Sequence, residues 1–435
     1  MTLFPITVPA SLAESLGLDP ATDDWGHEIR HAVGTGAGDT YVLSGLWRRD
    51  GQRTEDGGRG FVLQLITRHA PDGAATATAV IPYEVPGGTR STISWGNESN
   101  LALLPDGTLV LSSRPGNTHL LAPGLDRELA GWRMSTYSWT KEENGPDDPF
   151  AASVAVTPGG RLLCLVSETS LENWGVPIPN LVAVSDPGEV LAPGHKPVLH
   201  AFATLSTSAA RQTEQDAHPH VRHVGAPVLG DNRPSPALGT LVSGLVGGSA
   251  YDWDRAFLHR PAPLSDELYV VPVYGRTYRS GSRGQRFAFA LLDAEGTVHG
   301  HLGGLDRHAD SPYTGHLFDV TTDPHRGLAF HLNRYGLYAW TADGTLRAAL
   351  RTTEALFKAL AHFALLTATP TGELLLAHRK QHFVLRVPVP GDLTALGESV
   401  TEALAGLAKA RNAAKKQHAP VNWLWTTPTG AVHHL

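Results

Sequence analysis

The chain has 435 residues with 46 glycines, 31 prolines, a single cysteine and a net charge of −7. A negative chain offers no basic surface for a polyanion, so nucleic acid is not expected as a partner. One cysteine excludes an intrachain disulfide, no stretch approaches about 18 continuous apolar residues, and the N-terminus lacks a charged start followed by an apolar run, so we expect a cytoplasmic protein with no membrane partner.

Residues 1–38 are predicted to be a lead-in. A short helix is expected from Ser11 to Gly17, because Ser11 and Glu14 have the spacing of a capping box. Apolar strand-like runs follow at 41–47, 60–67 and 76–81. The remaining residues, 39–435, are therefore expected to form a single domain.

The clearest structural unit is the segment 317–350. It is predicted to contain four strands, 317–320, 327–332, 336–341 and 346–350, with a hairpin at Asp343-Gly344. A four-stranded antiparallel sheet cannot bury both of its faces alone, so further copies are expected to stack against it.

A Pro-x-Gly turn between apolar runs recurs along the chain. Proline sets one turn dihedral and glycine supplies the positive one, so each copy predicts a turn between two strands. The turns contain Pro105, Pro158, Pro370 and Pro428, with a degenerate copy at Pro263. The predicted units are 41–82, 98–133, 151–202, 252–302, 315–350 and 362–390.

The repeat predicts an all-β propeller with six or seven blades. Pro105 and Pro158 are 53 residues apart, and Pro158 and Pro370 are 212 apart, which is four such intervals. This spacing favours seven blades, with residues 203–250 as either an irregular blade or an insertion. We expect strands from both termini to close the ring, with a strand at 422–427 sharing a blade with strands from 41–82, since closure removes exposed sheet edges.

One element does not follow the repeat. Residues 392–416 place apolar side chains at helical spacing, so a C-terminal amphipathic helix is predicted. Those side chains are Leu393, Leu396, Val400, Leu404 and Leu407. Packing on the propeller is favoured over docking to a partner, because apolar stripes usually face the protein's own core.

Polar residues precede several of the predicted innermost strands. If these strands surround a channel, the polar residues form a ring at one of its mouths. The long loops that lead into the strands lie at the same mouth, and we call them the loop-rich face: 83–99, 134–152, 203–250 and 303–316. The candidate catalytic and metal-binding residues are Glu98, His316 and His362. The candidate ligand-binding residues are Asn97, Asn100, Ser153, Asp252, Asp254 and Asn422.

Two interpretations of this ring stay open. Imidazoles and a carboxylate together suit a divalent metal ion or acid–base chemistry. Polar residues also line propeller channels simply because strand ends need hydrogen bonds and the channel holds water. No phosphate-binding loop, zinc-protease motif or serine-hydrolase elbow is present to decide between them.

The turns and four-stranded units resemble the β-propeller superfamily over about residues 40–435. They are more similar to irregular lactonase and NHL-like propellers than to WD40 repeats, because no Gly-His…Trp-Asp signature recurs. The resemblance implies a scaffold that binds a protein partner or a small-molecule ligand on the loop-rich face. The alternative that it implies is a metal-assisted hydrolase or lyase, so the question of enzymatic activity is left open.

Overall fold

The computed structural model describes part of the chain. These are residues 3–6, 8–9, 25–48, 61–82, 100–113, 117–133, 150–168, 178–188, 197–204, 221–223, 256–258, 260–276, 285–302, 320–333, 335–378, 382–416, 425–426 and 431–434. The predicted helix at Ser11–Gly17 lies outside these ranges.

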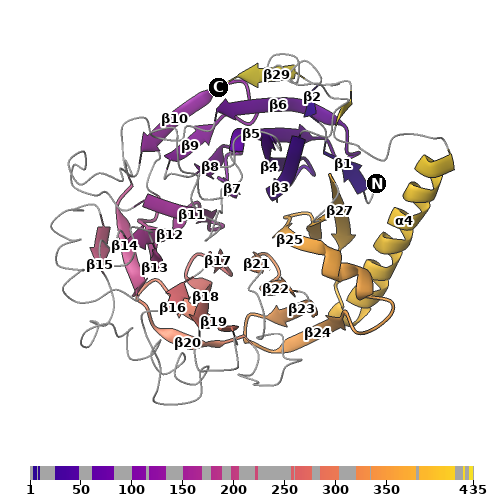
Figure 1. Cartoon of the computed structure of the whole chain (residues 1–435). Helices are drawn as coiled ribbons and strands as arrows, with labels where there is room; N and C mark the ends of the chain where they lie inside the picture. Colours follow the sequence, from indigo (N-terminus) through magenta and orange to yellow (C-terminus); the bar gives the residue numbers. More distant parts are fainter. Residues whose placement is uncertain are drawn as a thin grey trace.

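Six sheets of the described residues stand around a central axis, so the chain is a six-bladed β-propeller (Figure 1). The first blade contains β3 (Trp25–Gly34), β4 (Thr40–Arg48), β5 (Phe61–His69) and β6 (Ala75–Pro82); the second contains β7 (Asn100–Leu103), β8 (Leu109–Ser113), β9 (Asn117–Leu121) and β10 (Glu128–Arg133). The third contains β11 (Phe150–Val156), β12 (Leu162–Glu168), β13 (Ile178–Ser185), β14 (Leu199–Thr204) and β15 (Val221–His223).

The fourth blade contains β16 (Ala256–Leu258), β17 (Ala262–Pro263), β18 (Leu268–Arg276), β19 (Gln285–Asp293) and β20 (Val298–His301). The fifth contains β21 (Val320–Asp323), β22 (Leu328–Asn333), β23 (Gly336–Thr341) and β24 (Leu346–Arg351); the sixth contains β25 (Phe363–Ala368), β26 (Glu373–His378) and β27 (Phe383–Pro388). In each of these sheets the chain runs from the axis outward, and in the fourth blade both β16 and β17 pair with the side of β18 that faces away from β19 (Figure 1).

The preference for seven blades was wrong, because the repeat is not evenly spaced. Pro158, Pro263, Pro324 and Pro370 lie just after or at the end of the innermost strands of four consecutive blades, so 212 residues span three intervals and not four. The interval from the third blade to the fourth is long because residues 203–250 intervene. Their described part supplies the end of β14 and then β15, which extends the third blade.

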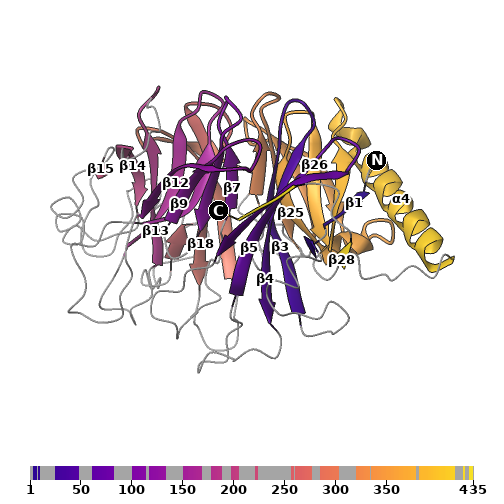
Figure 2. The same cartoon turned by 90° about the horizontal axis from the view of Figure 1, so that it is seen from above.

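The core lies between neighbouring blades. Every residue of β22 is buried, because this strand is covered on both faces by the adjacent sheets. The short turns after the innermost strands gather at one end of the ring, the upper edge in Figure 2. Gly107 and Gly372 have φ of 87° and 80° in two of these turns, the left-handed conformation that glycine adopts without strain.

Both termini close the ring, as predicted, but with different partners. β29 (Ala431–His434) pairs in parallel with β6 at the outer edge of the first blade, and β1 (Leu3–Pro5) pairs antiparallel with β27 at the outer edge of the sixth. The expected strand at 422–427 is instead β28 (Trp425–Thr426), which pairs with β2 (Val8–Pro9). The lead-in is also shorter than predicted, since β3 is already part of the first blade.

The predicted C-terminal helix is confirmed. A 3₁₀ turn, η3 (Leu393–Ala395), leads into α4 (Leu396–Lys416), which lies beside the sixth blade (Figure 1). Leu396, Val400 and Leu407 are buried in the same core cluster as β27, so the helix packs on the propeller. Within the described ranges, no helix is both long and apolar enough to cross a membrane.

Candidate functional site

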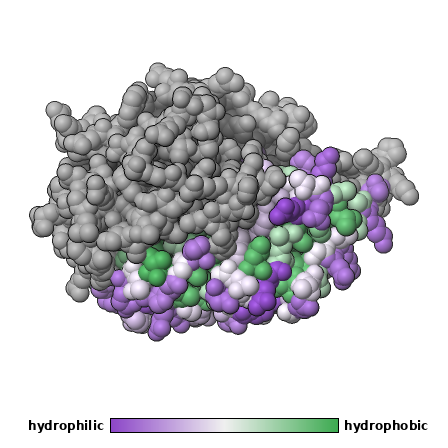
Figure 3. All heavy atoms as spheres, turned by 90° about the horizontal axis from the view of Figure 1, so that it is seen from below, coloured by the Kyte–Doolittle hydropathy of each residue, from purple (hydrophilic) through white to green (hydrophobic). Residues whose placement is uncertain are grey.

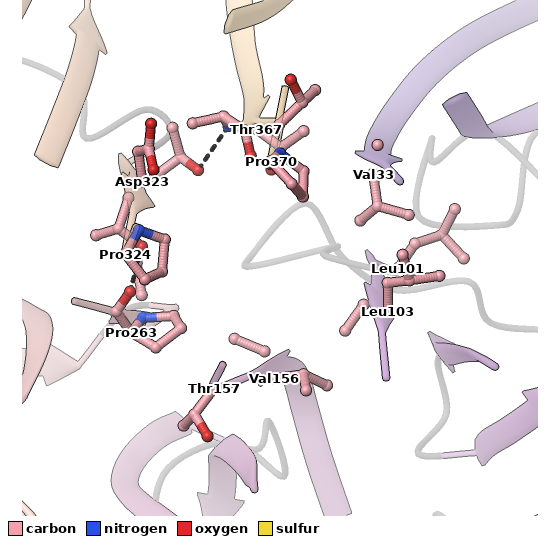
Figure 4. A pocket seen from close by; sticks show the side chains of 18 of the residues that line it. Val33, Leu101, Leu103, Val156, Thr157, Pro263, Asp323, Pro324, Thr367 and Pro370 are labelled. Carbon is pink, nitrogen blue, oxygen red and sulfur yellow. Dashed lines mark hydrogen bonds between the residues drawn. The ribbon is translucent and has the colours of Figure 1, made fainter. Parts of the chain in front are cut away.

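A central channel lies between the described residues of the six inner strands. Its volume is about 410 Å³, and every blade contributes to its wall. Figure 4 shows apolar side chains such as Val33, Leu103 and Val156 on one part of the wall and Asp323 and Thr367 on another. This volume is within the range of about 300–1,000 Å³ that is typical of small-molecule sites.

Prolines of the repeated turns surround one mouth of this channel. Pro105, Pro158 and Pro370 are exposed at the second position of their turns, and Pro324 lies beside them on the fifth blade. Each of these three turns closes with a backbone hydrogen bond of 2.9 Å, such as that from Gly160 N to Thr157 O. Proline fixes φ, so this rim is rigid before any ligand arrives.

Side chains of the inner strands bond to the backbone of the next blade. Asn100 joins the second blade to the third: its Oδ1 accepts from Val154 N at 3.0 Å, and its Nδ2 donates to Val154 O. His31 Nδ1 accepts from Leu101 N at 3.2 Å, and Thr321 Oγ1 accepts from Ala368 N at 3.1 Å. These bonds hold the wall of the channel in one arrangement.

Arginines join blades farther from the axis. Arg161 of the third blade donates to Asp266 O at 3.2 Å in the fourth blade. Arg386 of the sixth blade donates to Pro71 O and to Thr40 Oγ1, both at 2.8 Å, across the seam to the first blade. Bonds from a charged donor are about twice as strong as neutral ones, so these contacts stiffen the ring.

Three of the predicted site residues lie within the described ranges. Asn100 and Ser153 are both buried, on neighbouring inner strands. Asn100 lines the channel, but its side-chain oxygen and nitrogen both bond to the backbone of Val154. His362 is exposed at the end of η2 (Lys358–His362), where its ring stacks on His378 at 6.1 Å between centroids, and it does not line the channel.

The remaining predicted site residues lie outside the described ranges: Asn97, Glu98, Asp252, Asp254, His316 and Asn422. The loop-rich face falls almost entirely outside them as well. Among the residues that the structure does describe, no three of His, Cys, Asp or Glu are grouped closely enough to hold a metal ion. The metal site and the acid–base ring therefore stay predictions.

Charged side chains in the channel wall are few. Asp323 is paired with Arg326, whose Nε lies 2.6 Å from its Oδ2, and it also accepts from Arg326 N at 3.3 Å. His31, His325 and Arg260 complete the set of charged and titratable groups in the described wall. Arg260 was not predicted as a site residue, because the segment that follows it was not recognised as an inner strand. The signal available in the sequence was an arginine directly before Pro261-Ala262-Pro263.

Buried histidines elsewhere belong to the seams between blades. His27 Nδ1 and His382 Nδ1 lie 2.7 Å apart between the first and sixth blades, and burial lowers the pKa of His27 well below its usual value. Burial also lowers the pKa of His69 to about 4, with a smaller contribution of the same sign from Arg386. Cys164 is buried, and burial raises the pKa of its thiol to about 12, which makes it unreactive.

No protein-family model and no curated protein matches the chain. Among solved structures it is similar to the WD40 propeller domain of Doa1 (10% identity, 84% of this chain and 97% of that chain covered, TM-score 0.35) and to YCF48 bound to the D1 peptide (10%, 85% and 98%, 0.36). It is also similar to BamB from Moraxella catarrhalis (10%, 82% and 84%, 0.33). Likenesses this weak carry no argument about function, so the propeller assignment rests on the six sheets themselves.

Proposed function

We propose that this propeller is a non-catalytic binding protein that holds its ligand or partner at the proline-lined mouth of the central channel. The observation that carries the proposal is the rigid channel of about 410 Å³ with exposed prolines from several blades at its rim. A preformed site loses little conformational entropy on binding, which favours affinity.

The outer surface offers less support for binding. Three large apolar residues of the described chain are exposed, Leu129, Leu346 and Leu356, and they lie on different elements. Figure 3 shows one face of the molecule, and over its described part hydrophilic and hydrophobic residues are interspersed. Scattered apolar residues of this kind are normal on monomeric proteins and do not mark an interface.

Selection of linear peptides from a displayed library against the whole chain tests this proposal. Peptides that bind the unmodified protein should lose at least tenfold in affinity for a Pro105→Glu/Pro370→Glu double variant, which adds two charges to the rim. Both positions tolerate the change, because the second residue of such a turn accepts most side chains. Arg127→Glu, on an exposed turn of the second blade, is the matched control and should bind normally.

Failure to enrich any peptide, or equal binding to the double variant, would contradict a site at this mouth. Binding at the loop-rich face, the cytoplasmic location and the metal-assisted alternative remain predictions from the sequence. Elemental analysis of untagged protein addresses the last of these, because about one metal ion per chain would favour the hydrolase or lyase interpretation.

A further inference from the structure

Arg260 is the one cationic side chain of the described channel wall that has no counter-charge. The described residues of the wall include a single carboxylate, Asp323, and Arg326 already neutralises it. Among the described residues, the guanidinium of Arg260 makes no hydrogen bond and no ion pair, although it is only partly exposed. Keeping a half-buried cation without a partner costs free energy, so a site of this kind favours the binding of an anion.

The backbone around Arg260 is held in place. Pro261 and Pro263 follow within three residues and both are buried, so the φ angles beside the arginine are fixed. Thr322 Oγ1 donates to Pro263 O at 2.5 Å from the neighbouring blade. Arg260 therefore lies directly before β17 on a rigid segment of the channel wall, so an ion pair with it needs no reorganisation of the backbone.

The rest of the wall restricts what the anion can be. Leu103, Val156 and Ala368 are half-buried wall residues from three blades, and they offer apolar surface. Two threonine hydroxyls of the wall already donate to backbone carbonyls, Thr322 Oγ1 to Pro263 O and Thr367 Oγ1 to Ala368 O. One cation among apolar groups suits one negative charge, whereas a phosphate needs several donors or charges.

We infer that the channel binds a molecule with an apolar body and one carboxylate, and that Arg260 forms a bidentate pair with that carboxylate. The planar guanidinium matches the two carboxylate oxygens, and the partly desolvated wall strengthens the pair. The inference rests on the proposed function and deepens it, because it names the class of ligand. A free organic acid and the C-terminus of a peptide share this chemistry.

Isothermal titration calorimetry on the full chain tests the inference with two pairs of probes. 4-Phenylbutyrate is compared with 4-phenylbutanol, and an acetylated Leu-Val-Ala peptide with a free C-terminus is compared with its amide. At least one acid should bind, and its uncharged counterpart should bind at least tenfold more weakly. The pair that responds identifies whether the natural ligand is a free acid or a peptide terminus.

Variants of Arg260 assign the effect to this side chain. Arg260→Gln should weaken binding of the acid at least tenfold, and Arg260→Lys should retain part of it, since lysine keeps the charge but not the fork. Arg127→Gln is the matched control, because this arginine is exposed and outside the channel wall. Unchanged thermal unfolding of each variant shows that the fold is retained.

The inference is overturned if neither acid binds, if the alcohol or the amide binds as well as its acid, or if Arg260→Gln binds normally. Inorganic phosphate binding in preference to both acids would overturn it as well. The selected peptides separate this inference from the proposed function. If their affinity depends on the rim prolines but not on a free carboxylate, the proposed function stands and this inference fails.

Discussion

The side-chain amide of Asn100 spans the gap between the second and third blades. Its position at the start of an inner strand was predicted correctly, but its donor and acceptor both face the backbone of Val154. Ser153, the residue before Val154, is also buried, yet its Oγ has no hydrogen-bond partner in the part of the chain that the structure describes. The sequence pattern treated these two residues alike, but Asn100 joins two blades and Ser153 does not.

Asn100→Ala should lower the free energy of unfolding by roughly 2–4 kcal/mol, because it leaves both the N–H and the C=O of Val154 buried and unpaired. Ser153→Ala is the matched control and should change it by less than about 1 kcal/mol, since no bond is lost. Chemical denaturation measures both. Equal effects of the two substitutions would contradict the structural role of Asn100.

Buried histidines make stability depend on pH. The pKa of His69 is about 4 in the folded protein, below its unfolded value of about 6.5, so the unfolded state binds the extra proton first as the pH falls. The contribution is fully present above about pH 6.5 and declines as the pH falls toward 4, by roughly 3 kcal/mol in total. His27 acts in the same direction.

Denaturation at a series of pH values should therefore show the free energy of unfolding falling between about pH 6.5 and 4. His69→Asn should reduce that slope, because asparagine does not titrate in this range and can still donate to Gly73 O. His362→Asn, a substitution of the same kind at an exposed position, is the matched control. A slope that is the same in all three proteins would contradict the burial effect at His69.

At the scale of elements, turns and strands follow from local chemistry. β23 has the predicted bounds, β22 is shifted by one residue at both ends, and β24 ends one residue later than predicted. β21 runs from Val320 to Asp323, three residues later than the strand predicted at 317–320. A single apolar run does not specify where the pairing with the next strand begins.

Helix α4 also belongs to this scale, because its apolar side chains are buried against the sixth blade. Leu396→Ala should lower the free energy of unfolding by roughly 2–5 kcal/mol, since Leu396 is fully buried and its removal leaves a cavity. Glu402→Ala on the exposed side of the helix should change it by less than about 0.5 kcal/mol. Thermal and chemical unfolding measure both effects. If the helix instead docked to a partner, neither substitution would lower the free energy of unfolding of the isolated protein.

At the scale of the whole molecule, the ring is closed in two separate ways. β1 and β29 complete the outer edges of the two blades that meet at the seam, and Arg386 bonds across the seam nearer the core. Because these contacts are independent, loss of one leaves the others in place.

Deletion of residues 428–435 should lower the melting temperature by a few degrees, because it removes β29 and exposes the backbone edge of β6. Arg386→Leu should lower it as well, since three charge-assisted bonds are lost, to Pro71 O, Gly38 O and Thr40 Oγ1. The two changes together should lower it further and broaden the transition in scanning calorimetry. An unchanged melting curve for the truncated protein would contradict closure by the C-terminus.

The sequence by itself determined the strands, the turns, the propeller class and the helix at 392–416, because proline and glycine dihedrals and apolar periodicity act over a few residues. Only the tertiary structure decided that there are six blades, which edge each terminus completes, and that Asn100 bonds to a neighbouring blade while Arg260 has no described partner in the channel. These features depend on contacts between residues far apart in the chain. The spacing of repeats cannot specify such contacts when a long segment such as 203–250 interrupts it.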